Sequence, residues 1–256
     1  MLNQIEGGDI NILPVMSIEA NAKTDKIEVP QTLPILAMRD SVLFPGTILP
    51  VTIGRDKSVK LVRALYKTTR VIGTATQIDV HKDDPRLADL YEIGCSAKIL
   101  KLIEMPDGAL TAVLQGIRRF RIESIIAEEP YIIGIIENLA DIFPAKDDKD
   151  IKALSDSIKE SALRIVKYSS SFAAESEFAI KNIDSFEFLT NFIASTLDNE
   201  VVADKIKLLM ESDIKQRAYK LLAVLSKQIE ILKIKDAKER QQAIADNPSL
   251  FGLASE

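Results

Sequence analysis

Tryptophan is absent from this 256-residue sequence, and cysteine and histidine occur once each, as Cys95 and His81. A lone cysteine excludes an internal disulfide and fits a reducing compartment. One imidazole cannot form a site of paired histidines, and one cysteine with one histidine cannot complete a structural zinc site. Asp83 and Asp84 lack the alternating spacing of a calcium loop, so we expect them to be loop charges. The sequence therefore predicts no metal site.

Long hydrophobic runs and an excess of positive charge are also lacking. No stretch approaches the ~20 apolar residues that a membrane helix needs, and the densest run, YIIGII at 131–136, suits a buried strand. The opening MLNQIEGGDINILPVMS has no basic segment before an apolar one and makes a poor signal peptide. The net charge of −5 argues against a nucleic-acid partner. We therefore expect a cytoplasmic protein with no membrane partner.

Catalytic and cofactor-binding motifs are missing as well. None of the ten glycines precedes a lysine, which excludes a Walker-type phosphate loop. The dinucleotide fingerprint GxGxxG and the serine-hydrolase elbow GxSxG are both absent. One Ser-x-x-Lys pattern, Ser212 to Lys215, stands where a helix begins, and we interpret Ser212 as the cap of that helix. We expect no catalytic residue and no cofactor in this chain.

The chain changes character near residue 140. Residues 1–31 are polar without a clear period, which predicts a flexible leader. Residues 32–140 carry short β-branched apolar runs between spaced glycines and prolines, which predicts a β-rich domain. Pro106-Asp107-Gly108 indicates a hairpin turn, and the apolar spacing over 56–66 indicates one helix. We expect strands at 34–38, 47–53, 70–76, 93–104, 109–115, 118–126 and 131–138.

Residues 141–235 switch to a helical period and predict a bundle. Asp184 to Glu187 has the spacing of a capping box. The last apolar stripe continues for several turns, so it predicts a long helix that packs along the bundle or projects from it. Residues 236–256 form either a helical extension or a divergent tail. Apolar stripes mark four helices, which begin near Ile151, Asp184, Val201 and Asp213.

Several ordered motifs resemble a known family. The stretch from Leu33 to Val59, LPILAMRDSVLFPGTILPVTIGRDKSV, resembles the opening of the N-terminal substrate-binding region of Lon, the ATP-dependent AAA+ serine protease. The resemblance covers about residues 32–235. It implies an α+β fold, in which a PUA-like β-barrel domain with one helix precedes an all-α helical bundle that ends in a long helix. Further matches follow in order at 72–77, 89–99, 116–122 and 188–225.

The resemblance implies a non-catalytic region that recognises substrates and supports assembly. Unfolded or damaged polypeptides would be its partners, and ATPase and protease modules absent from this chain would supply catalysis. ATP and Mg²⁺ would bind only in the ATPase module, and the full-length protein would be a hexamer that serves protein quality control. Two alternatives stay open. One is a stand-alone LON-domain adaptor, and the other is an RNA-binding protein, which the acidic balance and the few aromatics oppose.

Four candidates for substrate contact lie near the start of the β domain. Arg55, Asp56 and Lys57 open its helix, where we expect all three side chains to be exposed. Phe44 precedes Pro45-Gly46, a pair that redirects the chain, so we expect Phe44 to fill core space. The alternative places Phe44 on the rim of a peptide-binding groove.

Two further candidates, Arg119 and Arg121, alternate with Phe120 along one predicted strand. We expect them on a solvated face, paired with acids of a neighbouring strand. The alternative is a small basic patch for acidic substrate segments. Arg39 stands between two apolar runs, and we expect it to pair with a buried carboxylate that fixes the geometry of its loop.

Overall fold

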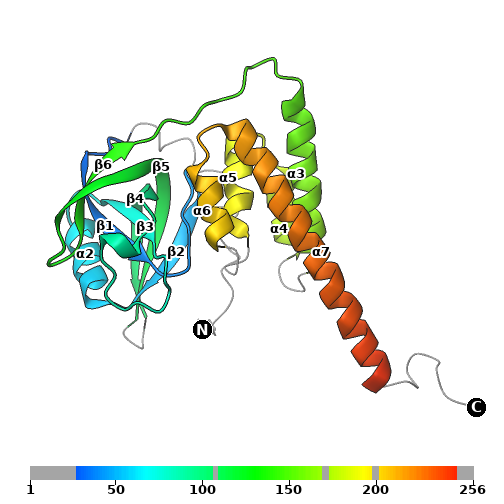
Figure 1. Cartoon of the computed structure of the whole chain (residues 1–256), viewed down its shortest axis with the longest axis horizontal. Helices are drawn as coiled ribbons and strands as arrows, with labels where there is room; N and C mark the ends of the chain where they lie inside the picture. The colour runs from blue at the N-terminus through cyan, green and yellow to red at the C-terminus, as the bar shows by residue number, and fades with distance from the viewer. Residues whose placement is uncertain (1–26, 106–108, 169–172, 198–201, 247–256) are drawn as a thin grey trace, which may run out of the picture.

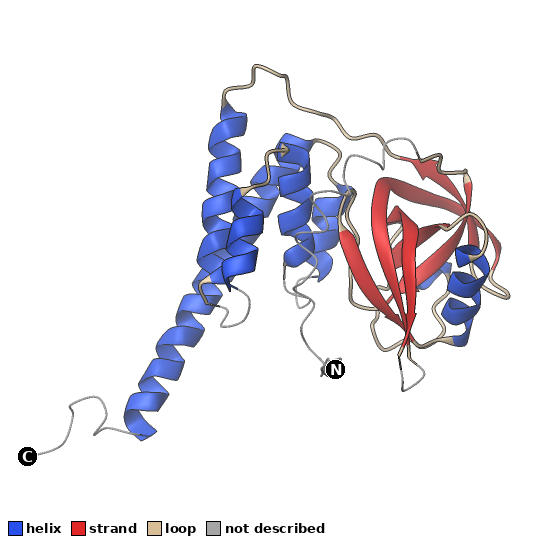
Figure 2. Ribbon diagram, turned by 180° about the vertical axis from the view of Figure 1, so that it is seen from behind, coloured by secondary structure: helices blue, strands red, loops and turns tan. Residues whose placement is uncertain are grey.

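The computed structural model describes residues 27–105, 109–168, 173–197 and 202–246. The Pro106-Asp107-Gly108 turn, most of the expected leader and the last residues of the tail lie outside these ranges. A sheet-rich half and a helical half stand side by side (Figure 1), and Figure 2 shows the same division from behind. The expected order, a barrel with one α-helix followed by a helical bundle, is confirmed.

Among the residues that the structure describes, six strands form one sheet that closes on itself. Their order is β2-β5-β4-β3-β1-β6, and β6 also pairs with β5. Five strands therefore complete a barrel, while β2 pairs with the first part of β5. Strand β1 runs parallel to β3, and the other pairs are antiparallel. The strands are β1 (Thr32–Met38), β2 (Ile48–Ile53), β3 (Val71–Thr76), β4 (Ile93–Glu104), β5 (Leu110–Ala127) and β6 (Ile133–Asn138).

Strand β5 corrects the sequence analysis, because the predicted strands 109–115 and 118–126 form one continuous strand. Gly116 lies between them and pairs with Ala97 of β4, and the register with β4 shifts by one residue directly after it. Its N–H donates to the Thr47 carbonyl oxygen (2.9 Å). A Cβ at this position would lie 2.1 Å from the Phe44 carbonyl oxygen. Glycine is therefore required here by the close approach of another backbone rather than by a turn.

Helix α2 (Asp56–Tyr66) connects β2 to β3 and lies against the barrel. Val62 is buried, as the apolar spacing predicts, and so is Leu61 beside it. Both side chains join the core cluster formed by β1, β3, β4 and β5. The loop from β3 to β4 contains a short 3₁₀ helix, η2 (Leu87–Asp89). This loop folds back to the first turn of α2, as its hydrogen bonds to that turn show.

In the described ranges, five helices follow β6, one more than the apolar stripes predict. The additional helix is α4, whose hydrophobic residues do not form a clear stripe. Helix α7 continues past residue 235, so the described part of the expected tail is a helical extension that projects from the bundle (Figure 1). The helices are α3 (Asp150–Val166), α4 (Ala173–Lys181), α5 (Phe186–Thr196), α6 (Val202–Met210) and α7 (Ile214–Asp246).

Two helix caps lie one residue later than expected. Ser185 rather than Asp184 caps α5, because its hydroxyl oxygen accepts a backbone N–H from the first turn (3.2 Å). Asp213 rather than Ser212 caps α7, because its carboxylate accepts the N–H three residues later (3.0 Å). A shift of one residue lies within the uncertainty with which helix ends are assigned.

One apolar cluster joins the two halves, while two further clusters lie in the barrel half. Phe44 of the β1–β2 loop and Ile93 of β4 belong to the same buried cluster as Phe188 and Phe192 of α5. Asn191 of α5 also donates a hydrogen bond to the Pro45 carbonyl oxygen (3.3 Å). Burial of these side chains therefore couples the position of the bundle to that of the barrel.

Candidate functional site

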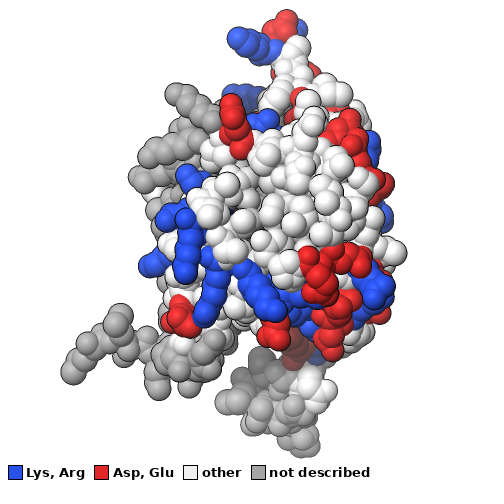
Figure 3. Space-filling view, turned by 90° about the vertical axis from the view of Figure 1, so that its left-hand side faces the viewer, with Lys and Arg blue, Asp and Glu red and all other residues white. Residues whose placement is uncertain are grey.

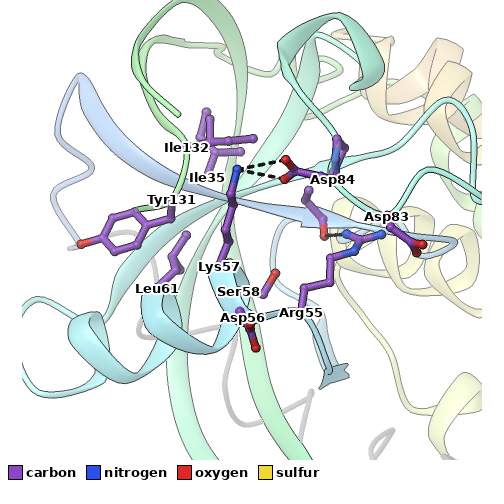
Figure 4. A pocket seen from close by; sticks show the side chains of 12 residues that line it. Ile35, Arg55, Asp56, Lys57, Ser58, Leu61, Asp83, Asp84, Tyr131 and Ile132 are labelled. Atoms are coloured by element: carbon purple, nitrogen blue, oxygen red, sulfur yellow. Dashed lines mark hydrogen bonds and ion pairs between the residues drawn. The ribbon is translucent and has the colours of Figure 1, made fainter. Parts of the chain in front are cut away.

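A hollow of about 250 Å³ lies beside the first turn of α2, and we call it the α2 pocket. Figure 4 shows its side chains converging from α2, from β1 and from the two loops before β4 and β6. One part of the lining is apolar and comes from Ile35, Leu61, Tyr131 and Ile132. The other part is charged and comes from Arg55, Asp56, Lys57, Asp83 and Asp84. The α2 pocket is thus an apolar surface edged by charge.

Lys57 connects the two loops that border the α2 pocket. Its ammonium group forms ion pairs with Asp84 (2.9 Å) and Glu129 (2.7 Å). Hydrogen bonds to Glu129 and Asp84 raise the pKa of Lys57 above its usual value. All three groups keep substantial contact with solvent, so each pair contributes little to stability by itself. The arrangement nevertheless neutralises the lysine and leaves it less available to a charged ligand.

Arg55 corrects an expectation, because its guanidinium is not a free surface charge. It donates to the carbonyl oxygens of Ala37 (3.3 Å) and Lys82 (3.3 Å) and to the side-chain oxygen of Gln77. Gln77 is buried and also donates to the Lys82 carbonyl oxygen (2.9 Å). Burial lowers the pKa of Arg55. Arg55 therefore holds the β3–β4 loop in place, whereas its neighbour Asp56 is exposed as expected.

A second and wider hollow of about 750 Å³ adjoins the α2 pocket, and we call it the β1–β2 groove. It lies between residues 36–38 of β1 and residues 50–53 of β2. The two hollows share the lining residues Ala37, Arg55, Ser58 and Asp83, so they adjoin, and we call them together the depression. The volume of the β1–β2 groove falls within the ~300–1,000 Å³ that ligand pockets span.

Arg39 at the edge of the β1–β2 groove also departs from expectation. It pairs with Asp83 (3.1 Å), but that carboxylate is 91 % exposed rather than buried. The pair therefore crosses the surface of the depression instead of fixing a buried geometry. Exposed pairs of this kind contribute ~0–1 kcal/mol to stability. A ligand that entered the groove would displace this pair at small energetic cost.

The remaining candidates lie away from the depression. Phe44 is completely buried between barrel and bundle, so the core role is correct and the groove-rim alternative is wrong. Arg121 is half-exposed and pairs with Glu137 on the neighbouring strand β6 (3.1 Å), as expected. Arg119 corrects the expectation of a solvated face, because the bundle covers it and it pairs with Asp141 (2.6 Å). A basic surface patch at Arg119 is therefore excluded.

Three side chains that shape the depression carry no signal of that role in the sequence. Tyr131 and Ile132 line the α2 pocket, and buried Gln77 accepts a hydrogen bond from Arg55 beside it, because the loops before β4 and β6 fold back onto α2. Their positions depend on contacts between segments that lie far apart in the chain. A polar residue at the end of an apolar strand, such as Gln77, was the one local feature that could have indicated a buried hydrogen-bonding role.

Two surface features complete the description. Figure 3 shows the barrel face that points away from the bundle, where basic and acidic side chains gather along the lower edge and leave a broad uncharged area. Within the described ranges, acids, cysteine and histidine nowhere form a group of three that could hold a metal ion. None of the helices in these ranges is long and apolar enough to span a bilayer.

Comparison with known sequences matches residues 32–227 to the family described as the ATP-dependent protease La (LON) substrate-binding domain. The Lon protease of Cytophaga hutchinsonii is 41% identical over 226 residues, and that of Flavobacterium johnsoniae is 37% identical over 228 residues. These matches cover 88% and 89% of this chain. The chain spans 28% of the length of each of these two relatives.

Solved structures show the same fold. The N-terminal domain of Lon protease from the Mycobacterium avium complex superposes with a TM-score of 0.58 at 21% identity. The Lon N-terminal domain protein from Xanthomonas campestris superposes with a TM-score of 0.53 at 20% identity. Each match covers 76% of this chain and 98% of the solved chain. These solved chains therefore share the arrangement of barrel and helices although only about one residue in five is identical.

Proposed function

Because the chain belongs to the family of Lon substrate-binding domains, we propose that its β domain binds unfolded or damaged polypeptide. The family is a non-catalytic part of Lon, so the expected partner is a protein chain rather than a small-molecule substrate. We also propose that ATPase and protease modules complete the activity, that ATP and Mg²⁺ bind in the ATPase module, and that the assembly is a cytoplasmic hexamer. Helix α7, which projects from the bundle, is suited to lead toward such modules.

The observation that carries the proposal is the composition of the α2 pocket. An unfolded client exposes apolar side chains in no fixed order, so its receptor needs a shallow apolar surface rather than a deep, shaped cavity. Tyr131 is partly exposed and supplies such a surface, and the buried side chains of Ile35, Leu61 and Ile132 form its floor. Lys57 and Asp84 beside it neutralise each other, which favours contact with apolar segments over contact with strongly charged ones.

A titration with an unfolded protein tests this proposal. Fluorescently labelled β-casein should bind the wild-type chain weakly, and a folded protein of similar size should not. Ser58 lines the pocket and is small, so Ser58→Arg should fill the space and weaken binding about tenfold, the equivalent of losing one buried apolar contact. Ser157→Arg on an exposed position of α3 is the matched control and should bind like wild type. Equal binding by both variants would remove the α2 pocket as the receptor surface.

A further inference from the structure

Strand β2 is hydrogen-bonded to another strand on one edge only. It pairs with β5 from Ile48–Gln115 to Ile53–Leu110, and in the described part of the chain its other edge has no strand partner. Thr52 and Gly54 on this strand and just after it are exposed. An open strand edge of this kind offers unpaired backbone donors and acceptors to any extended chain.

The direction of each backbone group in β2 follows from alternation. Gly116 N–H donates to the Thr47 carbonyl oxygen, so Thr47 faces β5. Successive residues of a strand alternate, and the N–H and carbonyl of Ile48, Pro50 and Thr52 therefore point away from β5. Proline is tolerated at such an outward position because it has no N–H to lose from the ladder. Thr52 is the exposed residue of β2 that keeps both an outward donor and an outward acceptor.

The facing edge of β1 is also open beyond Ile35. Gln77 N–H donates to the Met38 carbonyl oxygen (2.7 Å), so Met38 faces β3. Ile35 N–H donates to the Ile132 carbonyl oxygen (2.9 Å), so Ile35 faces the opposite way, and Ala37 does so by alternation. The ladder between β1 and β6 ends at Pro34. Beyond it, the Ala37 carbonyl accepts from the Arg55 side chain rather than from a strand.

The β1–β2 groove therefore runs between two strand edges. We propose that an extended segment of client polypeptide binds in this groove as an added strand on β2, with its backbone hydrogen-bonded to Thr52 and Pro50. The inference rests on the proposed function, since it specifies how that client is held. Unfolded chains differ in every side chain but share one backbone, and strand addition recognises the backbone. The α2 pocket, which adjoins the groove, then receives side chains that project from the bound segment.

Pro50 should limit the pairing of this edge with a second copy of the chain. It removes one outward donor from the middle of β2, and proline on an edge strand hinders pairing with another copy. Fewer backbone hydrogen bonds also make the complex weak, which suits a receptor that must release its client. The Arg39–Asp83 pair at the rim is exposed, so a segment that enters the groove can displace it.

The test uses a single backbone donor. Thr52→Pro removes the outward N–H of Thr52 without breaking a bond to β5, so the barrel should still form, which circular dichroism and thermal unfolding check. Thr52→Val keeps that N–H and is the matched control. The probe is a fluorescein-labelled ten-residue peptide rich in valine and serine, together with the same peptide N-methylated at alternate residues. Strand addition predicts that Thr52→Pro and N-methylation each weaken binding about two- to tenfold, as loss of one or a few hydrogen bonds does.

Each other result has a defined meaning. If Thr52→Pro binds the unmodified peptide as tightly as wild type, strand addition on β2 is wrong while the proposed function stands. If Thr52→Val weakens binding as much as Thr52→Pro, a side-chain contact rather than the backbone is responsible, and strand addition is likewise overturned. If wild type binds neither the peptide nor β-casein, the proposed function itself fails. Dimerisation of wild type that Thr52→Pro abolishes would identify a second copy as the occupant and overturn the assignment to client.

Discussion

The Arg217 guanidinium lies 2.8 Å from Oδ1 of Asp141, a contact that ties helix α7 to the segment that leaves the barrel. The same oxygen accepts from Arg119 of β5 (2.6 Å). Both arginines are almost completely buried, and burial lowers the pKa of Arg217. One carboxylate thus serves two cations, and Arg217 also donates to the side-chain oxygen of Asn191 (2.8 Å). We interpret this cluster as the polar element that sets the orientation of barrel and bundle.

Asp141→Asn should destabilise the chain strongly. The substitution leaves Arg119 and Arg217 buried without a counter-ion, which costs about 3–5 kcal/mol in comparable cases. Urea unfolding followed by circular dichroism measures the change. Glu137→Gln is the control, since Glu137 pairs with half-exposed Arg121 and should cost less than about 1 kcal/mol. Similar losses in both variants would show that the buried cluster does not contribute in this way.

Gly116→Ala should destabilise the barrel because the added methyl group meets the backbone. Its Cβ would lie 2.1 Å from the Phe44 carbonyl oxygen and 2.8 Å from the carbonyl carbon. Backbone cannot rotate aside as a side chain can, so we expect a loss of at least about 2 kcal/mol. Gly54→Ala has open space around its Cβ and should be neutral or stabilise by up to about 1 kcal/mol. Thermal unfolding of the two variants gives the comparison, and a neutral Gly116→Ala would contradict the close approach.

Local features were predictable from the sequence, and features that depend on distant contacts were not. The strands and helix α2 follow from periodicity that a short window contains. The alternation of Arg119 with Phe120 along the strand was also predicted correctly, and Phe120 is buried. Alternation does not say what covers each face, and here the bundle, from residues about 90 positions later, covers Arg119. Its burial therefore had no local signature.

The candidate site could likewise be predicted only in its local features. Arg55 and Lys57 could be placed at the start of a helix, and both do border the depression. Whether they are free depends on the β3–β4 loop, which supplies Gln77 and Asp84 as partners. A polar loop in sequence gives no indication of where it folds back. The open edge of β2 was hidden for a related reason, since strand pairing is a property of the whole sheet.

Cys95 should resist alkylation in the folded chain. Its thiol is buried, and burial raises its pKa to about 12. An ordinary cysteine titrates near ~8.5, so at pH 8 unfolding should raise the thiolate fraction on the order of a thousandfold. Mass spectrometry after iodoacetamide treatment, with and without urea, measures the modified fraction over time. Cys95→Ala, which has no thiol to modify, gives the background. Rapid labelling of the native chain would contradict this burial.

The contact between helix α7 and Asp148, which lies just before α3, should weaken in acid. The Asp148 carboxylate accepts hydrogen bonds from Lys215 (2.7 Å) and from the Asp150 N–H (3.0 Å), and these bonds lower the pKa of Asp148 below its usual value. A group whose folded-state pKa is lowered stabilises the fold fully above its ordinary pKa, ~3.9 for aspartate, and loses that contribution as the pH falls through the lower folded value. Wild type should therefore unfold at a higher temperature than Asp148→Asn at pH 6, and the difference should shrink progressively below about pH 4.

Asp147→Asn provides the control for this pH dependence, because Asp147 is the adjacent, exposed aspartate. Its unfolding temperature should follow that of wild type at every pH, with a difference within the small range expected of an exposed substitution. Lys215 allows a second check at alkaline pH. Hydrogen bonds from its ammonium group to Asp148 and Asp150 raise the pKa of Lys215, so its contribution is complete below the ordinary lysine value and is lost only in strongly alkaline solution. A difference between wild type and Asp148→Asn that grew as the pH fell would contradict the direction of the Asp148 shift, and with it the hydrogen-bonded pair that joins Asp148 to α7.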